Sequence, residues 1–151
     1  MDNLQLENFL KNIAPPAEVK TGKQFAEALV PADALHELAS TLKDSKETLF
    51  DFLFCITGVD FGQNLGVVYH LRSTMHGHSI VLKVMCADKN NPVLPTVSGL
   101  WKSAEFFENE VFDLLGIRFS NHPFPRRLFL EEDAGFPLRK DYTDNINIVT
   151  K

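Results

Sequence analysis

Apolar residues recur at helical spacing in two stretches near the start of the chain. Asp2 is a suitable N-cap for the first helix, and Pro15-Pro16 ends it. The apolar face of this helix is formed by Leu6, Phe9, Leu10 and Ile13. A second helix is predicted to begin at Pro31, and its core-facing residues are Leu35, Leu38, Ala39 and Leu42. Residues 17–22 and 25–30 are compatible with either strand or loop.

Three extended segments follow in the middle of the chain. Residues 49–59 are almost entirely apolar and rich in Phe, which predicts a central strand covered on both faces. Residues 67–72 and 79–86 flank a loop that contains a glycine, and this spacing predicts a β-hairpin. The link over residues 88–95 contains two prolines and is expected to be irregular.

The longest predicted helix starts near Ser98 or Leu100 and ends at Gly116, a natural C-cap. Residues 127–131 are a candidate for a final short strand. Together the elements predict an α+β fold, a two-layer domain in which helices pack on one face of a mostly antiparallel sheet. We expect a single domain over residues 1–142 and a short C-terminal tail over residues 143–151.

Composition narrows the possible partners. The chain has 151 residues, of which 44% are apolar and 23% are charged, as in an ordered globular domain. A net charge of -5 argues against general affinity for nucleic acid or anionic lipid, because both favour basic surfaces. No apolar run approaches the ~20 residues that span a bilayer. We therefore expect protein partners, no nucleic acid, and membrane contact only through those partners.

Few side chains in the sequence have the spacing of metal ligands. Cys55 and Cys86 lie in apolar runs without a second cysteine nearby, which favours core packing for both. Metal sites and iron–sulfur clusters usually take about four ligands. The histidines weighed as ligands are His70, His76, His78 and His122. Because no acidic residue accompanies them at ligand spacing, we expect no metal, and we assign His122 a structural hydrogen bond.

Two residues break the pattern of the helix over residues 101–115. Glu108 falls inside the apolar arc, and Phe106 falls on the polar side, where it is a plausible partner contact. A carboxylate in an apolar stripe costs free energy unless it is paired. Three interpretations stay open for Glu108: a salt bridge within the chain, a contact with a basic partner surface, or a catalytic carboxylate. The candidate internal partners are Arg118, Arg126, Arg127 and Arg139.

Charge of both signs, proline and aromatic residues are concentrated in residues 122–142. No glycine-rich loop is present to cradle a phosphate, and the local charge is close to balanced. This mixture favours interlocking salt bridges at a protein–protein interface. We expect no catalytic and no cofactor-binding residue. The predicted partner-binding residues are Glu108, Glu110, Asp113, His122, Arg126, Arg127, Arg139, Lys140, Asp141 and Tyr142.

The same region resembles a known family. Residues 108–119 read ENEVFDLLGIRF, His122-Pro123 and Arg126-Arg127 follow, and residues 135–142 read GFPLRKDY. These motifs are similar to those of the thirty-kilodalton subunit of respiratory complex I, which is the C subunit of the bacterial NADH:quinone oxidoreductase. The resemblance covers roughly residues 50–142. The departures from the family pattern are Asn109 for Arg, Phe124-Pro125 for Asp-Leu, and Ala134 for Trp.

The resemblance implies a non-catalytic structural subunit of the hydrophilic arm of a proton-translocating NADH:quinone oxidoreductase. It implies no cofactor in this chain, with iron–sulfur clusters, FMN and quinone in partner subunits. The implied partners are the quinone-site subunit of the forty-nine-kilodalton type and the terminal iron–sulfur subunit, at the cytoplasmic face of the bacterial cell membrane. Two alternatives stay open: the equivalent subunit of a membrane-bound nickel–iron hydrogenase or formate hydrogenlyase, and a free-standing enzyme using Glu108 and His122 in a deep pocket.

Overall fold

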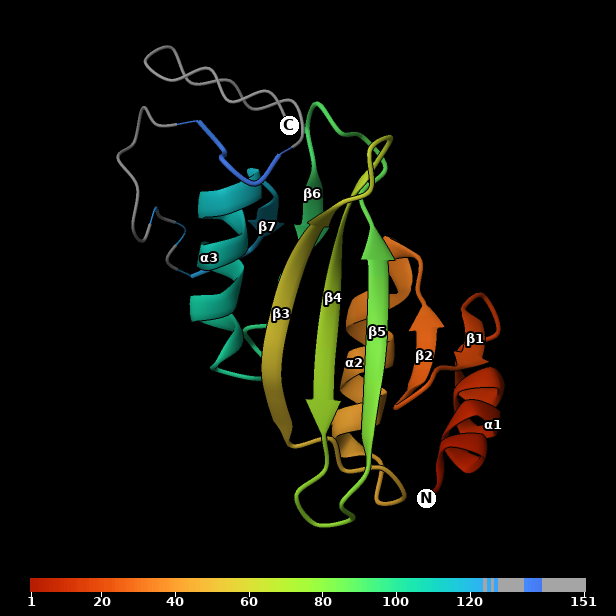
Figure 1. Cartoon of the computed structure of the whole chain (residues 1–151). Helices are drawn as coiled ribbons and strands as arrows, with labels where there is room; N and C mark the ends of the chain where they lie inside the picture. Colours follow the sequence, from red (N-terminus) through yellow and green to blue (C-terminus); the bar gives the residue numbers. More distant parts are fainter. Residues whose placement is uncertain (124, 126, 128–134, 140–151) are drawn as a thin grey trace.

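The computed structural model of the chain describes residues 1–123, 125, 127 and 135–139. Its main sheet has five strands in the order β1-β2-β5-β4-β3 (Figure 1). These strands are β1 (Glu18–Thr21), β2 (Ala26–Leu29), β3 (Phe52–Asp60), β4 (Leu65–Arg72) and β5 (Ser79–Met85). The helices are α1 (Asn3–Ile13), the 3-10 turn η1 (Ala32–Ala34), α2 (Leu35–Asp44) and α3 (Ala104–Leu115).

The layers agree with the predicted α+β fold. β2 pairs with β5 in parallel, and the other neighbours in the main sheet pair antiparallel. In Figure 1, α2 lies behind the strands, α1 lies beside β1, and α3 lies beside β3. The view looks onto the other face of the sheet, where no described helix crosses β3, β4 or β5. The core therefore lies between one face of the sheet and the helices.

Local signals at the N-terminus predicted the structure well. Asp2 and Gln5 form a capping box, in which the Asp2 carboxylate accepts from the backbone N–H of Gln5 at 2.8 Å. Both ambiguous segments form strands, β1 and β2. Pro31 precedes η1, and α2 buries all four residues expected on its apolar face.

Two predictions about strands are wrong. The Phe-rich run forms β3, which is an edge strand and not a central one. The Phe residues of this run do not share one environment. Phe50 lies in the core before the strand begins, whereas Phe52 is 46% exposed on the open face. The link over residues 88–95 is not wholly irregular either. Within it, β6 (Val93–Pro95) pairs in parallel with β7 (Arg118–Ser120) to form a second, small sheet.

The long helix begins later than predicted, at Ala104. Residues 97–103 form turns instead, and two side chains there bind backbone carbonyls just before and within β3. The Trp101 indole N–H donates to the Phe50 carbonyl at 2.9 Å, and the Ser103 hydroxyl donates to the Leu53 carbonyl at 2.9 Å. Gly116 ends the helix with φ of +78°, as predicted for a left-handed C-cap. The strand predicted over residues 127–131 lies outside the described residues, apart from Arg127.

Within the described part of the chain, no helix is both long enough and apolar enough to cross a lipid bilayer.

Candidate partner-binding site around α3

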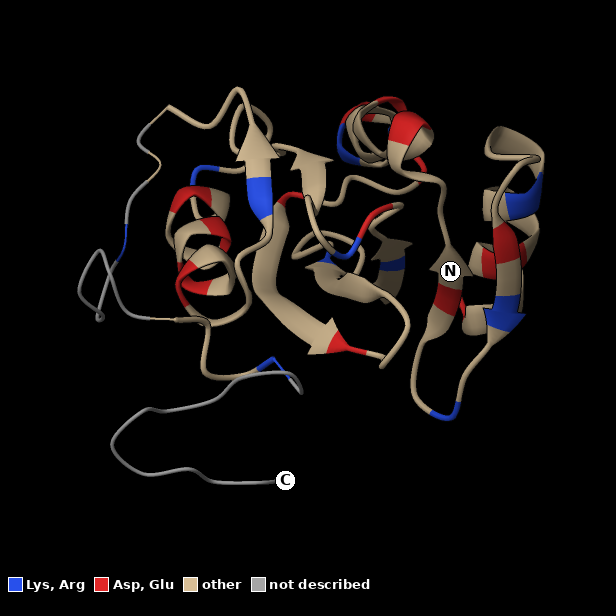
Figure 2. Cartoon of the chain, turned by 90° about the horizontal axis from the view of Figure 1, so that it is seen from above, with Lys and Arg blue, Asp and Glu red and all other residues tan. Residues whose placement is uncertain are grey.

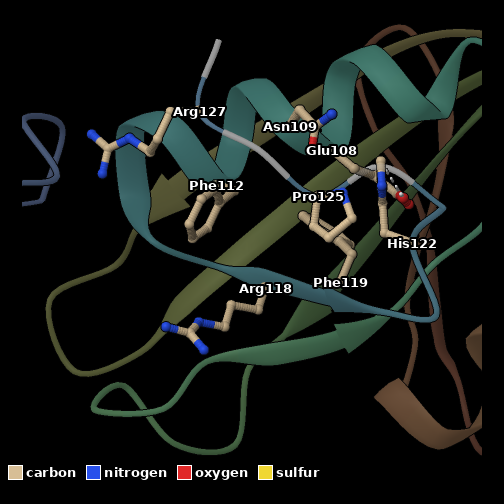
Figure 3. A pocket seen from close by; sticks show the side chains of 8 residues that line it. All are labelled: Glu108, Asn109, Phe112, Arg118, Phe119, His122, Pro125 and Arg127. Carbon is tan, nitrogen blue, oxygen red and sulfur yellow. Dashed lines mark ion pairs between the residues drawn. The ribbon is translucent and has the colours of Figure 1, made fainter. Parts of the chain in front are cut away.

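A hollow of about 370 Å³ lies between α3, β7 and the residues that follow β7 (Figure 3). Its lining mixes aromatic rings with ionisable groups, and it contains several of the residues that the sequence singled out. The lining residues are Glu108, Asn109, Phe112, Arg118, Phe119, His122, Pro125 and Arg127. Figure 3 shows Glu108 and His122 facing each other at one end of the hollow.

Glu108 is fully buried, as its place in the apolar arc predicts. Its partners in the described part of the chain come from the segment before α3 and not from an arginine. One carboxylate oxygen accepts from the Thr96 hydroxyl, and the other accepts from the Val97 backbone N–H at 3.0 Å. An internal salt bridge to Arg118, Arg127 or Arg139 is therefore not what compensates this carboxylate.

Burial raises the pKa of Glu108 to about 7 from its usual 4.5, although the hydrogen bonds from Thr96 and Val97 oppose the shift. The surroundings also suit a neutral carboxyl. The Thr96 hydroxyl lies 2.8 Å from the Ser98 hydroxyl, so it can donate to Ser98 and accept from a protonated Glu108. The site holds either protonation state of Glu108 without losing a hydrogen bond.

His122 is also largely buried, and its Nε2 lies 3.9 Å from Oε1 of Glu108. The same nitrogen lies 3.0 Å from the Glu105 carbonyl oxygen, which is the structural hydrogen bond expected for this residue. The two residues assigned to a hypothetical enzyme do converge in a hollow. Both oxygens of Glu108 already accept hydrogen bonds from the chain, so this arrangement is poorly suited to acid–base catalysis on a substrate.

Asp113 forms the shortest ion pair of the site. Its carboxylate is fully buried and accepts from Nε of Arg127 at 2.6 Å. The Arg127 guanidinium also donates to the Gly135 carbonyl at 2.9 Å and lies 4.9 Å from the centre of the Phe136 ring. Although Asp113 was predicted to contact a partner, its carboxylate is covered by Arg127 of the same chain.

Residues 135–139 pack on the C-terminal end of α3. The Leu138 backbone N–H donates to the Leu114 carbonyl at 3.0 Å, which satisfies one of the carbonyls left open at a helix end. The Arg139 guanidinium donates to the Lys89 carbonyl at 3.1 Å. The ammonium of Lys89 lies 3.6 Å from Asp60 at the end of β3. This segment is thus tied to the helix and to the loop before β6.

The structure brings five of the ten predicted partner-binding residues together around α3. They are Glu108, Asp113, His122, Arg127 and the half-buried Glu110. Arg139 lies at the nearby loop before β6. Arg126, Lys140, Asp141 and Tyr142 lie outside the described residues. Figure 2 shows acidic residues on successive turns of α3, the helix at the left of the view.

Sequence reasoning missed Thr96 and Val97, and it did not predict that Phe136 packs within the chain. A backbone N–H is present at every residue except proline, so nothing in the sequence marks Val97 as the donor to Glu108. The Phe136 ring lies so close to Gly116 that a Cβ added there would meet it at 2.8 Å.

The environments of the cysteines and histidines agree only partly with the predictions. Cys86 is buried, as predicted, but Cys55 is only half-buried on the open sheet face, so core packing is wrong for it. His76 and His78 bind the carbonyls of Lys46 and Thr48 at 2.9 and 2.8 Å. Across the described ranges, no group of three His, Cys, Asp or Glu side chains is arranged to hold a metal ion.

Comparison with known proteins gives a consistent set of relatives. The family model described as respiratory-chain NADH dehydrogenase, 30 Kd subunit, matches residues 28–145. The C subunit of the NADH-quinone oxidoreductase of Moorella thermoacetica is 37% identical over 145 residues, which cover 94% of this chain and 95% of that protein. The fused C/D subunit of the NADH-quinone oxidoreductase of Phocaeicola vulgatus is 48% identical over 120 residues. That match covers 78% of this chain but only 23% of the relative.

A solved structure is similar over nearly the whole fold. It is that of the membrane-bound sulfane sulfur reductase, an archaeal respiratory membrane complex. One of its chains superposes with a TM-score of 0.81 and 25% sequence identity, covering 97% of this chain and 88% of that chain.

Proposed function

The chain belongs to the family of the respiratory-chain NADH dehydrogenase 30 Kd subunit, and we propose that it is a non-catalytic structural subunit of a proton-translocating NADH:quinone oxidoreductase. The observation that carries this proposal is the pairing of Asp113 with Arg127. This buried pair holds residues 135–139 against α3 and so prepares a rigid surface for docking. A surface ordered in advance lowers the entropic cost of binding.

The chemistry of the hollow supports a structural role. Glu108 and Asp113 are the buried carboxylates of α3, and each is held by donors from elsewhere in the chain. Groups that are fully engaged in this way stabilise an arrangement and leave little capacity for catalysis. We therefore propose that electrons pass through cofactors of neighbouring subunits, namely FMN, iron–sulfur clusters and quinone, while this chain positions those neighbours.

The proposed partners are the quinone-site subunit of the forty-nine-kilodalton type and the terminal iron–sulfur subunit. We propose that residues 122–142 form the main contact, with Arg126, Arg139, Lys140, Asp141 and Tyr142 facing the partners. Arginine and aromatic residues dominate the energetics of many interfaces. The chain would then be peripheral, held at the cytoplasmic face of the bacterial cell membrane through the complex.

The test is purification of the native complex. The chain would be tagged at its N-terminus in its own host, the membranes solubilised gently, and the co-purifying proteins identified by mass spectrometry. We expect stoichiometric quinone-site and iron–sulfur subunits, together with NADH-dependent quinone reduction by the eluted complex. A chain that elutes alone from membranes with intact NADH:quinone activity contradicts the proposal.

A second candidate is the equivalent subunit of a membrane-bound nickel–iron hydrogenase or formate hydrogenlyase. Similarity to a chain of the membrane-bound sulfane sulfur reductase favours it, because a similar fold then also occurs in a respiratory membrane complex that reduces sulfane sulfur. The same purification separates the candidates. A flavin-containing NADH-oxidising subunit in the eluate supports the first, and hydrogen-dependent electron transfer without that subunit supports the second.

A further inference from the structure

The open face of the main sheet is unusually apolar. In antiparallel sheets a face that meets water normally carries polar residues at alternate positions. Here Phe52 is 46% exposed and Leu29 is 38% exposed on this face, and Phe61, 48% exposed, lies over Gly66 beside it. The face also carries the half-buried Phe54, Cys55, Val59, Val68 and Met85. Phe52 and Phe61 stand at the two ends of β3, and the half-buried apolar residues lie between them, so apolar side chains run along the length of this face and favour an interaction site.

This face also has a groove, and a buried histidine nitrogen in the groove has no hydrogen-bond partner. A groove of about 570 Å³ runs between the turn before β2 and strands β4 and β5. His70 lies in this groove between the rings of Phe25 and Phe54, at centroid distances of 6.2 and 5.6 Å. Its Nδ1 is buried and has no hydrogen-bond partner. Burial lowers the pKa of His70, which favours a neutral ring at this face.

The charge of this face differs from that of the whole chain. Its described charged residues are the cations Lys20, Lys23, Arg72 and Lys83 and the carboxylates Glu18 and Glu27. Glu27 lies 3.8 Å from Lys20 and 3.4 Å from Lys83. Among the described residues, no carboxylate lies within salt-bridge distance of Lys23 or Arg72. The face is therefore basic, in a protein with a net charge of -5.

We propose that this open face binds an amphipathic helix of another subunit, with an apolar stripe against β3 and β4 and acidic residues toward Lys23 and Arg72. The inference rests on the proposed function, because it needs a multisubunit complex. The outer two of three neighbouring strands lie roughly 10 Å apart, which matches the diameter of one helix. A face-to-face pair of copies is disfavoured, because it would bring two basic faces together.

The experiment measures the accessibility of a thiol placed on this face. Thr57 is exposed on β3 and lies beside Cys55, so Thr57→Cys in a Cys55→Ser background introduces a reactive thiol there. The buried Cys86 is an internal control that should stay unlabelled until denaturation. A matched exposed control is Thr41→Cys on α2, in the helix layer. Each variant is labelled with a maleimide as the isolated chain and within the purified complex.

We expect the thiol at Thr57→Cys to react about tenfold or more slowly in the complex than in the isolated chain, because an interface core excludes water. Equal rates in the two states overturn the inference. Slow labelling of the isolated chain overturns it as well. Slow labelling that increases on dilution identifies a second copy, and slow labelling relieved by truncation after residue 142 identifies the chain's own tail.

Charge reversal tests the chemistry of the partner. Lys23→Glu with Arg72→Glu should restore fast labelling of the Thr57→Cys thiol in the complex, whereas Lys43→Glu with Lys46→Glu in the helix layer should not. If neither pair changes the labelling rate, the acidic character of the occupant is wrong. Failure of the chain to co-purify with any complex would refute the proposed function. Co-purification with an unprotected thiol would refute the sheet-face inference alone.

Discussion

The Arg127 side chain places Nε 2.6 Å from the Asp113 carboxylate and its guanidinium carbon 4.9 Å from the centre of the Phe136 ring. One arginine thus joins the last turn of α3 to a segment that follows it in the chain. An arginine assigned to partner contacts from the sequence is engaged within its own subunit. The interface role assigned to the segment then depends on its other basic residues.

Arg127→Ala should destabilise the isolated chain by ~3 kcal/mol or more, because it removes a cation that lies 2.6 Å from the buried Asp113 carboxylate. Asp113→Ala should cost a similar amount, and the double variant should cost less than the two single changes together. Urea denaturation of all four proteins measures the coupling. Lys11→Ala, which removes an exposed ion pair with Glu7, is the control and should leave the midpoint unchanged. Additive costs would show that the pair is not coupled.

Glu108 should make stability depend on pH. Its pKa is raised to about 7 in the folded chain from a usual 4.5. A carboxyl whose pKa is raised by folding binds its proton more tightly in the folded state. Its contribution to stability is therefore fully present below about pH 4.5 and is lost as the pH rises through 7. The loss amounts to about 3 kcal/mol at most.

Glu108→Gln removes this titration and keeps the shape of the neutral side chain. Its amide can accept from the Val97 N–H and donate to the Thr96 hydroxyl, which then donates to Ser98. We expect the variant to gain stability relative to the parent chain between pH 5 and pH 8, measured by urea denaturation at each pH. Glu108→Ala is the contrasting variant and should destabilise at every pH, because it strands buried donors. A difference between Gln and Glu that does not change with pH would contradict the raised pKa.

The sequence predicts best where a signal is local. The capping box at Asp2, the apolar face of α2 and the left-handed Gly116 each depend on residues within a few positions. The position of β3 at the sheet edge depends on which strands pair, and pairing is a long-range property with no local signature. Likewise, the partner of Glu108 is partly a backbone N–H, which every residue type except proline supplies.

Gly116→Ala should destabilise the chain by about 1 kcal/mol or more, because a Cβ is unfavourable at a positive φ. The added methyl group would also stand 2.8 Å from the Phe136 ring and push residues 135–139 away from α3. Gly99→Ala is the matched control, since nothing lies within 4 Å of its added Cβ. Thermal melts compare the two variants. Equal melting temperatures would mean that Phe136 does not pack on the end of α3.

The isolated chain is expected to bind no metal, flavin or nicotinamide. The reason is chemical, since the cysteines are not paired and the sequence has no glycine-rich phosphate loop. Elemental analysis and absorbance spectra of untagged protein are the measurements. Stoichiometric iron or zinc, or a flavin spectrum that survives dialysis, would refute the expectation. Iron or flavin, unlike redox-inert zinc, would also assign this chain a direct part in electron transfer.

Charge reversal at Arg126 and Arg139 together should release the subunit from its complex. Arg139 is half-buried and donates to the Lys89 carbonyl, and the buried Asp113 carboxylate keeps its Arg127 partner in the double variant, so the fold should survive. Arg127→Glu is the contrasting variant, because it places a second carboxylate beside buried Asp113 and should unfold the chain. Co-purification with the redox subunits and a circular dichroism melt are measured for each. A double variant that assembles normally, or one that unfolds like Arg127→Glu, would mean that these arginines serve the fold and that the subunit docks through another surface.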